Sequence, residues 1–331
     1  MINKRVKAGI VGIGVCLPDK VLTNDEIAKM VDTSDEWIQE RTGIKERRIA
    51  EDSQAASDLG VIAAQRALAQ AGVSADEVGL IIVATATADM QFPSTACIIQ
   101  DRLGIKNIPA FDVTAGCTGF IYALTIAAQF IANDFCRTVL VIGTEVLSKV
   151  TNWTDRETCI LLADGAGAVA LQPTAQGSGI LSMKIGSDGA GGKHLQLPAG
   201  GSRLPVTPEL IEANRNKLHM DGPEVFKFAM KMLPEVTEQA LALAGLRKDD
   251  IDLIVPHQAN IRIIEAAARR LDLPMEKFMV NLDRYGNTSS ASIPIAMHEA
   301  LESGRIKSGD VVVLTGFGAG LTWGSIVMRW I

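Results

Sequence analysis

Two hydrophobic patterns alternate along the chain. Short runs in which nearly every position is apolar, such as residues 9–14, 138–143 and 310–315, predict buried strands. Longer segments with polar residues at helical spacing, such as 120–132 and 291–303, predict helices that cover those strands. The alternation predicts an α/β protein.

Part of this pattern occurs twice. Residues 66–82 match residues 239–255 without gaps, and eight of the seventeen positions are identical. Each copy predicts an amphipathic helix that ends at a glycine, then an acidic turn and a buried strand. Similar offsets pair the strands at 138–143 with 310–315 and at 9–14 with 181–186. The repeats indicate two copies of one unit, with halves at 1–173 and 174–331.

Equivalent positions of two such halves are expected to meet about a pseudo-twofold axis. An offset of 170 residues aligns Cys117 with Asn287. In both copies a strand, predicted at 111–113 and 279–282, leads through a glycine turn into a helix. His257 directly follows the buried strand of the second repeat. Because ligands bind where strands of parallel sheets end, we expect the three side chains at one site.

Composition narrows the possible functions. A length of 331 residues, 47% of them hydrophobic, excludes a disordered or collagen-like chain. The net charge of −6 disfavours nucleic-acid binding by charge. No apolar window reaches the roughly 18 residues of a membrane span, and the glycine-containing run 8–17 predicts a first strand instead of a signal peptide. Five scattered cysteines without a C-x-x-C pair predict no disulfides and fit the cytoplasm.

Cys117, His257 and Asn287 together suit acyl transfer followed by carbanion chemistry. A helix N-terminus favours an anion and is expected to assist a Cys117 thiolate, which can accept an acyl group. Two hydrogen-bond donors can hold an enolate oxygen. The Asn amide donates but takes up no proton, which favours this role over hydrolysis. The alternative interpretations are a small buried cysteine and a core histidine.

A glycine-rich segment, 316–324, follows a predicted strand near the C-terminus. It permits close approach of backbone N–H groups to a ligand, or forms only a tight turn. A dinucleotide fingerprint is not supported, because Leu17 stands where its third glycine should be. The other histidines have no H-x-x-x-H spacing, so metal ligation has little support.

Seven segments resemble, in order, the β-ketoacyl-acyl carrier protein synthase III family, thiolase-fold condensing enzymes that initiate type II fatty acid synthesis. The resemblance covers essentially the whole chain and implies a five-layered α-β-α-β-α thiolase-like fold with a triad of Cys117, His257 and Asn287. The segments are 31–49, 92–100, 115–120, 164–169, 257–263, 285–294 and 316–324.

The reaction implied by the resemblance is a decarboxylative Claisen condensation. Cys117 takes the acyl group from an acyl-CoA, and the backbone N–H groups of Cys117 and Gly318 form the oxyanion hole. His257 and Asn287 then stabilise the enolate of malonyl-acyl carrier protein. No metal or redox cofactor is implied.

The resemblance also implies binding positions for coenzyme A and for the acidic carrier protein. Trp37 and Arg41 lie at i and i+4 on one helix face, which would let indole and guanidinium sandwich an adenine. The alternative interpretation is that these two residues only form part of a solvent-exposed helix face. The full coenzyme A set is Thr33, Trp37, Arg41, Arg156 and Asn260. The docking set is Lys227, Arg262, Arg269 and Arg270, of which the last three share one helix face.

The family is homodimeric, and Phe92 matches a phenylalanine that reaches the partner's acyl pocket. Ala319 and Leu321 replace the glycine and phenylalanine of many members, so acetyl-CoA is only a default primer. A thiolase proper is disfavoured because no cysteine follows Cys159. Two alternatives stay open: a related enzyme of specialised metabolism that joins or transfers other acyl groups, and a non-catalytic acyl-CoA-binding subunit.

Overall fold

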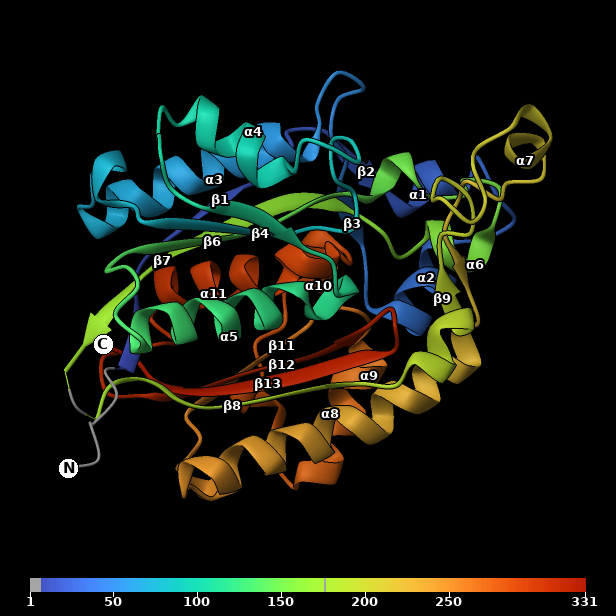
Figure 1. Cartoon of the computed structure of the whole chain (residues 1–331). Helices are drawn as coiled ribbons and strands as arrows, with labels where there is room; N and C mark the ends of the chain where they lie inside the picture. Colours follow the sequence, from blue (N-terminus) through green and yellow to red (C-terminus); the bar gives the residue numbers. More distant parts are fainter. Residues whose placement is uncertain (1–6, 176) are drawn as a thin grey trace.

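Two β-sheets form the framework of the molecule (Figure 1), whose computed structural model describes residues 7–175 and 177–331. The first sheet has the strand order β1 (Lys7–Cys16), β7 (Asp164–Thr174), β6 (Val139–Val146), β4 (Leu80–Ala84), β5 (Ala110–Val113). The second has the order β11 (Leu253–Pro256), β12 (Val311–Gly318), β13 (Thr322–Arg329), β8 (Gly179–Ser187). In each sheet the strand of the sequence repeat, β4 or β11, pairs in parallel with β6 or β12.

Helices cover both sheets and fill the space between them, which gives five layers (Figure 1). The first sheet is covered by α3 (Ala56–Ala71) and α4 (Thr95–Arg102), and the second by α8 (Gly222–Ala244) and α9 (Ile261–Leu271). The middle layer holds α5 (Gly119–Ala132) and α11 (Ser292–Glu302). Helix α5 packs between two sheets, and its Phe120, Ile121 and Leu124 are fully buried. The predicted α/β fold with α-β-α-β-α layers is confirmed.

Both copies of the sequence repeat have the predicted local structure. Helix α3 ends at Gly72 and α8 at Gly245, with φ of 64° and 70°, the left-handed conformation that glycine adopts without strain. Each glycine precedes a 3₁₀ turn, η1 (Ala75–Glu77) or η5 (Lys248–Asp250), and then the buried strand. The strand order β1-β7-β6-β4 of the first sheet recurs as β8-β13-β12-β11 in the second.

The strand predicted over residues 279–282 is wrong. At this place, which corresponds to β5, one isolated bridge to β11 is present, and the short helix α10 (Leu282–Tyr285) begins. The side chain of Gln258 takes the place of a strand ladder. Its amide nitrogen donates to Met279 O (3.0 Å), and its oxygen accepts from Asn281 N–H (3.0 Å). An apolar run in the sequence does not reveal such a substitution.

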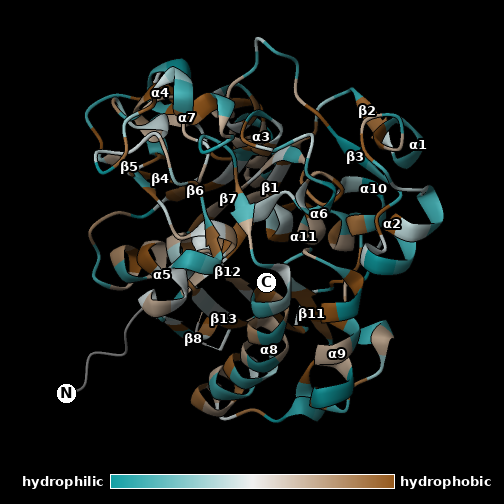
Figure 2. Ribbon diagram, turned by 90° about the vertical axis from the view of Figure 1, so that its right-hand side faces the viewer, coloured by the Kyte–Doolittle hydropathy of each residue, from teal (hydrophilic) through white to brown (hydrophobic). Residues whose placement is uncertain are grey.

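Shorter elements surround one end of the layers, and Figure 2 faces this end, with α2, α6 and α9 in view. The short strands are β2 (Val21–Thr23), β3 (Glu46–Arg48), β9 (Leu195–Gln196) and β10 (His219–Met220). The short helices and turns are α1 (Asn24–Ile27), α2 (Asp35–Thr42), α6 (Arg156–Cys159), α7 (Pro208–Glu212), η2 (Gly116–Thr118), η3 (Leu147–Lys149), η4 (Gly189–His194), η6 (Met275–Lys277) and η7 (Ser289–Ala291). None of the helices in the described ranges is both long enough and apolar enough to cross a membrane.

Candidate active site

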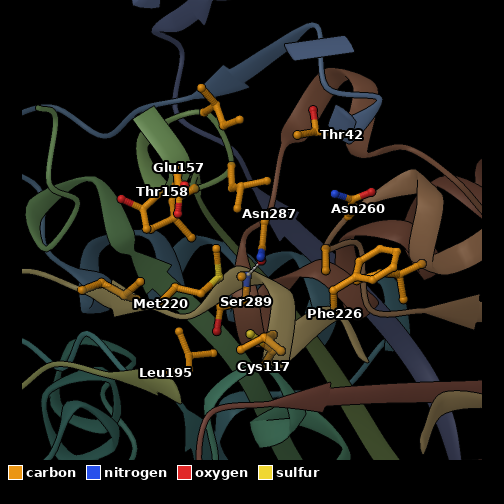
Figure 3. Close-up of a pocket in the computed structure, with 18 of the residues that line it drawn as sticks. Thr42, Cys117, Glu157, Thr158, Leu195, Met220, Phe226, Asn260, Asn287 and Ser289 are labelled. Carbon is orange, nitrogen blue, oxygen red and sulfur yellow. Dashed lines mark hydrogen bonds between the residues drawn. The ribbon is translucent and has the colours of Figure 1, made fainter. Parts of the chain in front are cut away.

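A cavity of about 550 Å³ lies at this end of the molecule. Cys117, His257, Asn287 and Gly318 all line it, so the structure brings the predicted triad and the predicted glycine together. Figure 3 shows Cys117 and Asn287 in this cavity. Cys117 comes from the first half of the chain, and the other three residues come from the second. The cavity is therefore built by residues that lie far apart in the sequence.

Cys117 lies in η2, the turn that leads from β5 into α5. Gly116 before it has a φ of 53°, which favours glycine. The last residue of β12, Gly318, lies directly against this turn. A Cβ added at Gly318 would fall 2.5 Å from the Cys117 backbone nitrogen. A larger residue at position 318 would therefore displace the turn that carries the thiol.

His257 follows the last residue of β11 and is buried. Its backbone N–H donates to Thr315 O (2.8 Å), and its ring Nδ1 lies 2.7 Å from the hydroxyl oxygen of Ser292. The ring packs edge-on against Phe317, with 5.6 Å between centroids. Burial lowers the pKa of His257 to about 3. The ring is therefore neutral at pH 7, and Nε2 is the nitrogen left for chemistry in the cavity.

The expected assistance to a Cys117 thiolate is outweighed by burial. Burial raises the pKa of Cys117 to about 12, while a hydrogen bond with Ser289 lowers it and the charge of Glu145 raises it. A helix dipole contributes only about 0.3–1 kcal/mol, less than one pKa unit. The free site therefore holds a thiol, in the same cavity as a neutral imidazole that can accept its proton.

Asn287 is fixed through both its backbone and its side chain. The backbone N–H donates to Leu161 O (2.8 Å), and the carbonyl accepts from Ala163 N–H (2.9 Å). The backbone N–H of Ser289 donates to the side-chain oxygen Oδ1 (2.9 Å), as Figure 3 shows. Because Oδ1 is occupied, the amide nitrogen Nδ2 is the group available to donate to a substrate.

Four of the five predicted coenzyme A residues line the cavity. Trp37 and Arg41 belong to α2, Arg156 begins α6, and Asn260 caps α9. Thr33 does not line the cavity. The guanidinium carbons of Arg41 and Arg156 lie 4.6 and 4.7 Å from the centroid of the Trp37 ring. Because both cations already stack on the indole, an adenine that stacks there must displace one of them.

The predicted docking residues are exposed on two helices that pack side by side (Figure 2). Lys227 belongs to α8, and Arg262, Arg269 and Arg270 belong to α9. The Nε of Arg262 donates to the carbonyl of residue 40 (3.0 Å), and Arg262 also lines the cavity. The cationic face of α9 therefore begins at the cavity.

Phe92 lies in the loop between β4 and α4. It is 82% exposed and does not line the cavity of its own chain. Met90 in the same loop is 51% exposed. The loop therefore presents two large apolar side chains to the outside of the chain.

Several site residues are not identified by sequence reasoning. Ser289 contacts Asn287, and Ser292 contacts His257. Their location within the segment 285–294 is the only feature of the sequence that points to these two serines. No pattern in the sequence identifies the apolar residues that line the cavity, because they come from separate elements. It includes Leu195 of β9, Met220 of β10 and Phe226 of α8 (Figure 3).

Comparison with known proteins decides the family. A family model described as 3-Oxoacyl-[acyl-carrier-protein (ACP)] synthase III matches residues 111–189, and the model of its C-terminal part matches residues 241–330. The Beta-ketoacyl-[acyl-carrier-protein] synthase III of Caldanaerobacter subterraneus is 54% identical over 327 residues, 99% of both chains. The protein of that name from Symbiobacterium thermophilum is 55% identical over 322 residues, 97% of this chain and 98% of its own. The chain belongs to the 3-oxoacyl-[acyl-carrier-protein] synthase III family.

A solved structure agrees with this assignment. The 3-oxoacyl-[acyl-carrier-protein] synthase III from Aquifex aeolicus has a TM-score of 0.91 and 45% identity, covering 98% of this chain and 100% of its own. The fold is thiolase-like, and the chain is an acyltransferase that carries out the initiating condensation of fatty acid synthesis. An enzyme of specialised metabolism or a silent subunit is not favoured, because relatives at 51–55% identity share one name over nearly their whole length.

Proposed function

We propose that Cys117, His257 and Asn287 condense a short acyl-CoA with malonyl-acyl carrier protein. The observation that supports this assignment is their common cavity, which is built by both halves and is also lined by Trp37 and Arg156. The two halves, 1–173 and 174–331, contribute the nucleophile and the enolate-binding pair respectively. The resulting product is a 3-oxoacyl-carrier protein.

In the first step, Sγ of Cys117 attacks the thioester carbon of acyl-CoA. The thiol proton passes to Nε2 of His257 and then to the sulfur of the departing coenzyme A. A neutral imidazole has a lone pair free at Nε2 to take this proton. Because burial disfavours both the thiolate and the imidazolium, the transfer accompanies the attack on the thioester and does not precede it. The N–H groups of Cys117 and Gly318, whose backbones lie in contact, serve as donors to the oxyanion.

In the second step, malonyl-carrier protein occupies the cavity. Cleavage of its carboxyl C–C bond releases carbon dioxide and leaves an enolate, whose oxygen accepts from His257 Nε2–H and Asn287 Nδ2–H. The enolate carbon attacks the acyl carbon and breaks its bond to Sγ of Cys117. The Cys117 thiolate then takes up a proton from solvent, which restores the thiol. The Ser292 hydroxyl can accept from or donate to His257 Nδ1, so the ring can present either tautomer.

Acyl labelling tests the first step. Radiolabelled acetyl-CoA should leave label on the wild-type chain, and Cys117→Ser should abolish it. Cys159→Ser, which alters a buried cysteine that does not line the cavity, is the matched control and should keep the label. A wild-type chain that takes no label from any short acyl-CoA would contradict the proposal. A panel of primers, with products read by mass, then defines the preference set by Ala319 and Leu321.

The part of the cavity lined by Trp37, Arg41, Arg156 and Asn260 is the proposed coenzyme A site, and Thr33 is a further proposed contact that does not line the cavity. The stacked Arg156–Trp37 pair supports this assignment, because an aromatic ring and a guanidinium are both good partners for adenine. Arg156→Ala should raise the KM for acyl-CoA and leave the KM for malonyl-carrier protein within about twofold. An equal rise in both would contradict the assignment.

A cytoplasmic homodimer is the proposed assembly, with Phe92 placed in the partner's acyl pocket. The 82% exposure of Phe92 and the neighbouring exposed Met90 support an interface at this loop. Sedimentation should give twice the chain mass, and Phe92→Ala should change the range of primers accepted. A monomer at micromolar concentration, or an unchanged primer range, would contradict this assembly.

A further inference from the structure

Glu145 is a buried carboxyl group that the proposed mechanism leaves unused. It lies in β6 with no exposed surface. None of the ion pairs formed within residues 7–175 and 177–331 includes it. Its oxygens instead contact the end of β4 and the turn η7, through Thr85, Ala86, Thr87 and Ser290. Glu145 therefore joins the two halves of the chain behind the cavity.

The contacts from the end of β4 can each supply a proton to Glu145. The backbone N–H of Ala86 lies 3.2 and 3.1 Å from the two carboxyl oxygens. The hydroxyl of Thr87 lies 2.7 Å from Oε2 and accepts from Val146 N–H (2.9 Å), so its own proton is directed at Oε2. The hydroxyl of Thr85 lies 3.4 Å from Oε2. These contacts can therefore form whether Glu145 is ionised or protonated.

The contact with Ser290, in contrast, requires a protonated Glu145. Its hydroxyl oxygen lies 2.8 Å from Glu145 Oε1 and also 2.8 Å from Ala84 O. A carbonyl oxygen only accepts, so the single hydroxyl proton of Ser290 is given to Ala84. The second contact, at hydrogen-bond distance, then needs a proton on Oε1. If Glu145 were ionised, one of these two contacts would bring two hydrogen-bond acceptors together with no proton between them.

We propose that Glu145 is a positioning residue that acts as a neutral carboxylic acid, donating to Ser290 and so fixing the turn that orients Asn287. Ser290 follows Ser289, whose N–H holds Asn287 Oδ1. Ser289 has a φ of 47°, a left-handed conformation that a serine keeps only where its surroundings enforce it. Ser290 fastens this turn to β4 and β6. The inference rests on the enolate-binding role proposed for Asn287.

A neutral Glu145 also suits the nucleophile. Burial raises the pKa of Glu145, and a negative charge there raises the pKa of Cys117. The neutral acid keeps the contact with Ser290 without adding a charge that opposes the developing thiolate. The nearby ionisable groups on packed elements are bound elsewhere: Asp164 of β7 to Ser148, and Tyr122 of α5 to Gly186.

Infrared difference spectroscopy tests the protonation state directly and does not depend on activity. At neutral pH, wild type minus Glu145→Gln should show the carbonyl stretch of a protonated carboxylic acid. Carboxylate stretches alone would overturn the inference even if the proposed function holds. Asp164→Asn is the matched control: Asp164 is also buried, but each of its contacts, from Ala50 N–H and from the N–H and hydroxyl of Ser148, brings its own proton. Its difference spectrum should show carboxylate bands, and an acid band there would mean that burial alone explains Glu145.

Kinetics test the positioning role. Glutamine reproduces the neutral acid, with Nε2 donating to Ser290, so Glu145→Gln should keep condensation within about threefold. Glu145→Ala and Ser290→Ala should lower kcat for condensation by about 10- to 100-fold, as expected for a displaced catalytic group. Acylation of Cys117 should fall much less than condensation, because the turn holds Asn287 directly and reaches Cys117 only through the Ser289 side chain, and the KM for malonyl-carrier protein should change by less than about twofold. If Glu145→Gln lowers kcat for condensation as much as Glu145→Ala does, the inference is overturned. If Glu145→Ala does not fold, Glu145→Gln is compared with Ser290→Ala instead.

Discussion

The proposed nucleophile, Cys117, and its proposed proton acceptor, His257, are both uncharged in the free site. Because the pKa of Cys117 is raised to about 12, the thiolate fraction is small at pH 7 and grows as pH rises. Alkylation of Cys117 by iodoacetamide, followed by mass, should therefore accelerate by about tenfold per pH unit up to at least pH 9. A plateau below pH 8 would instead indicate a preformed thiolate–imidazolium pair.

The role proposed for Asn287 belongs to only one of the two steps of the reaction. Its side chain is placed to donate through Nδ2 to an enolate, which exists only in the second step. Asn287→Ala should leave acylation of Cys117 intact and reduce condensation by about 10²- to 10³-fold. Stopped-flow release of coenzyme A and product mass measure the two steps. Asn133→Ala, at the exposed end of α5, is the control, and equal loss of both steps would count against the role of Asn287.

The triad is predictable at the level of residues, whereas its supporting contacts are not. Cys117 and Asn287 each precede a helix, and His257 follows a strand, so local patterns and the internal repeat point to all three. The link between Glu145 and Ser290 joins residues that are 145 positions apart. Only the packing of one half against the other brings these two side chains together, and no spacing in the sequence encodes it.

At the scale of elements, the incorrect strand at 279–282 leads to a stability prediction. Gln258 is buried and bonds to three backbone groups: the carbonyls of Pro256 and Met279 and the N–H of Asn281. Removing it leaves these groups unpaired in the interior. Gln258→Ala should lower the free energy of unfolding by about 2–3 kcal/mol, as measured by urea denaturation.

Gln65→Ala is the matched control for this measurement. Gln65 is exposed on α3, so its removal should change the free energy of unfolding by less than about 0.5 kcal/mol. Equal effects of the two substitutions would show that Gln258 does not replace a strand ladder. Regular elements such as α3 and α5 are predictable because burial repeats along them with a fixed period. A single side chain that substitutes for a strand has no period to detect.

At the scale of the whole molecule, the site lies where residues of the two sheets meet, as expected if the chain is a duplicated unit. The first sheet and its helices supply Cys117, and the second supply His257, Asn287 and Gly318. The repeat in the sequence predicts that equivalent positions meet. It does not predict the elements that surround the mouth of the cavity, such as α2 and α6, because these have no counterpart in the repeated segments.

The distribution of charge over the molecule gives the last prediction. The chain has a net charge of −6, and the proposed carrier-protein substrate is acidic, so attraction must come from a local positive surface. Arg269 is exposed on α9 and does not line the cavity, so it can be altered without touching the chemistry. Arg269→Glu should raise the KM for malonyl-carrier protein by about 3- to 10-fold, with a smaller effect at high salt.

Lys307→Glu provides the control for this change, because it alters the net charge by the same amount. Lys307 is exposed just before β12, at the opposite end of that strand from Gly318 and the cavity. If net charge alone governed the encounter, both reversals would raise the KM equally. If the carrier protein docks on α9, only Arg269→Glu should raise the KM for malonyl-carrier protein. The rate of Cys117 acylation by acyl-CoA should stay unchanged in both variants, because that step involves no carrier protein.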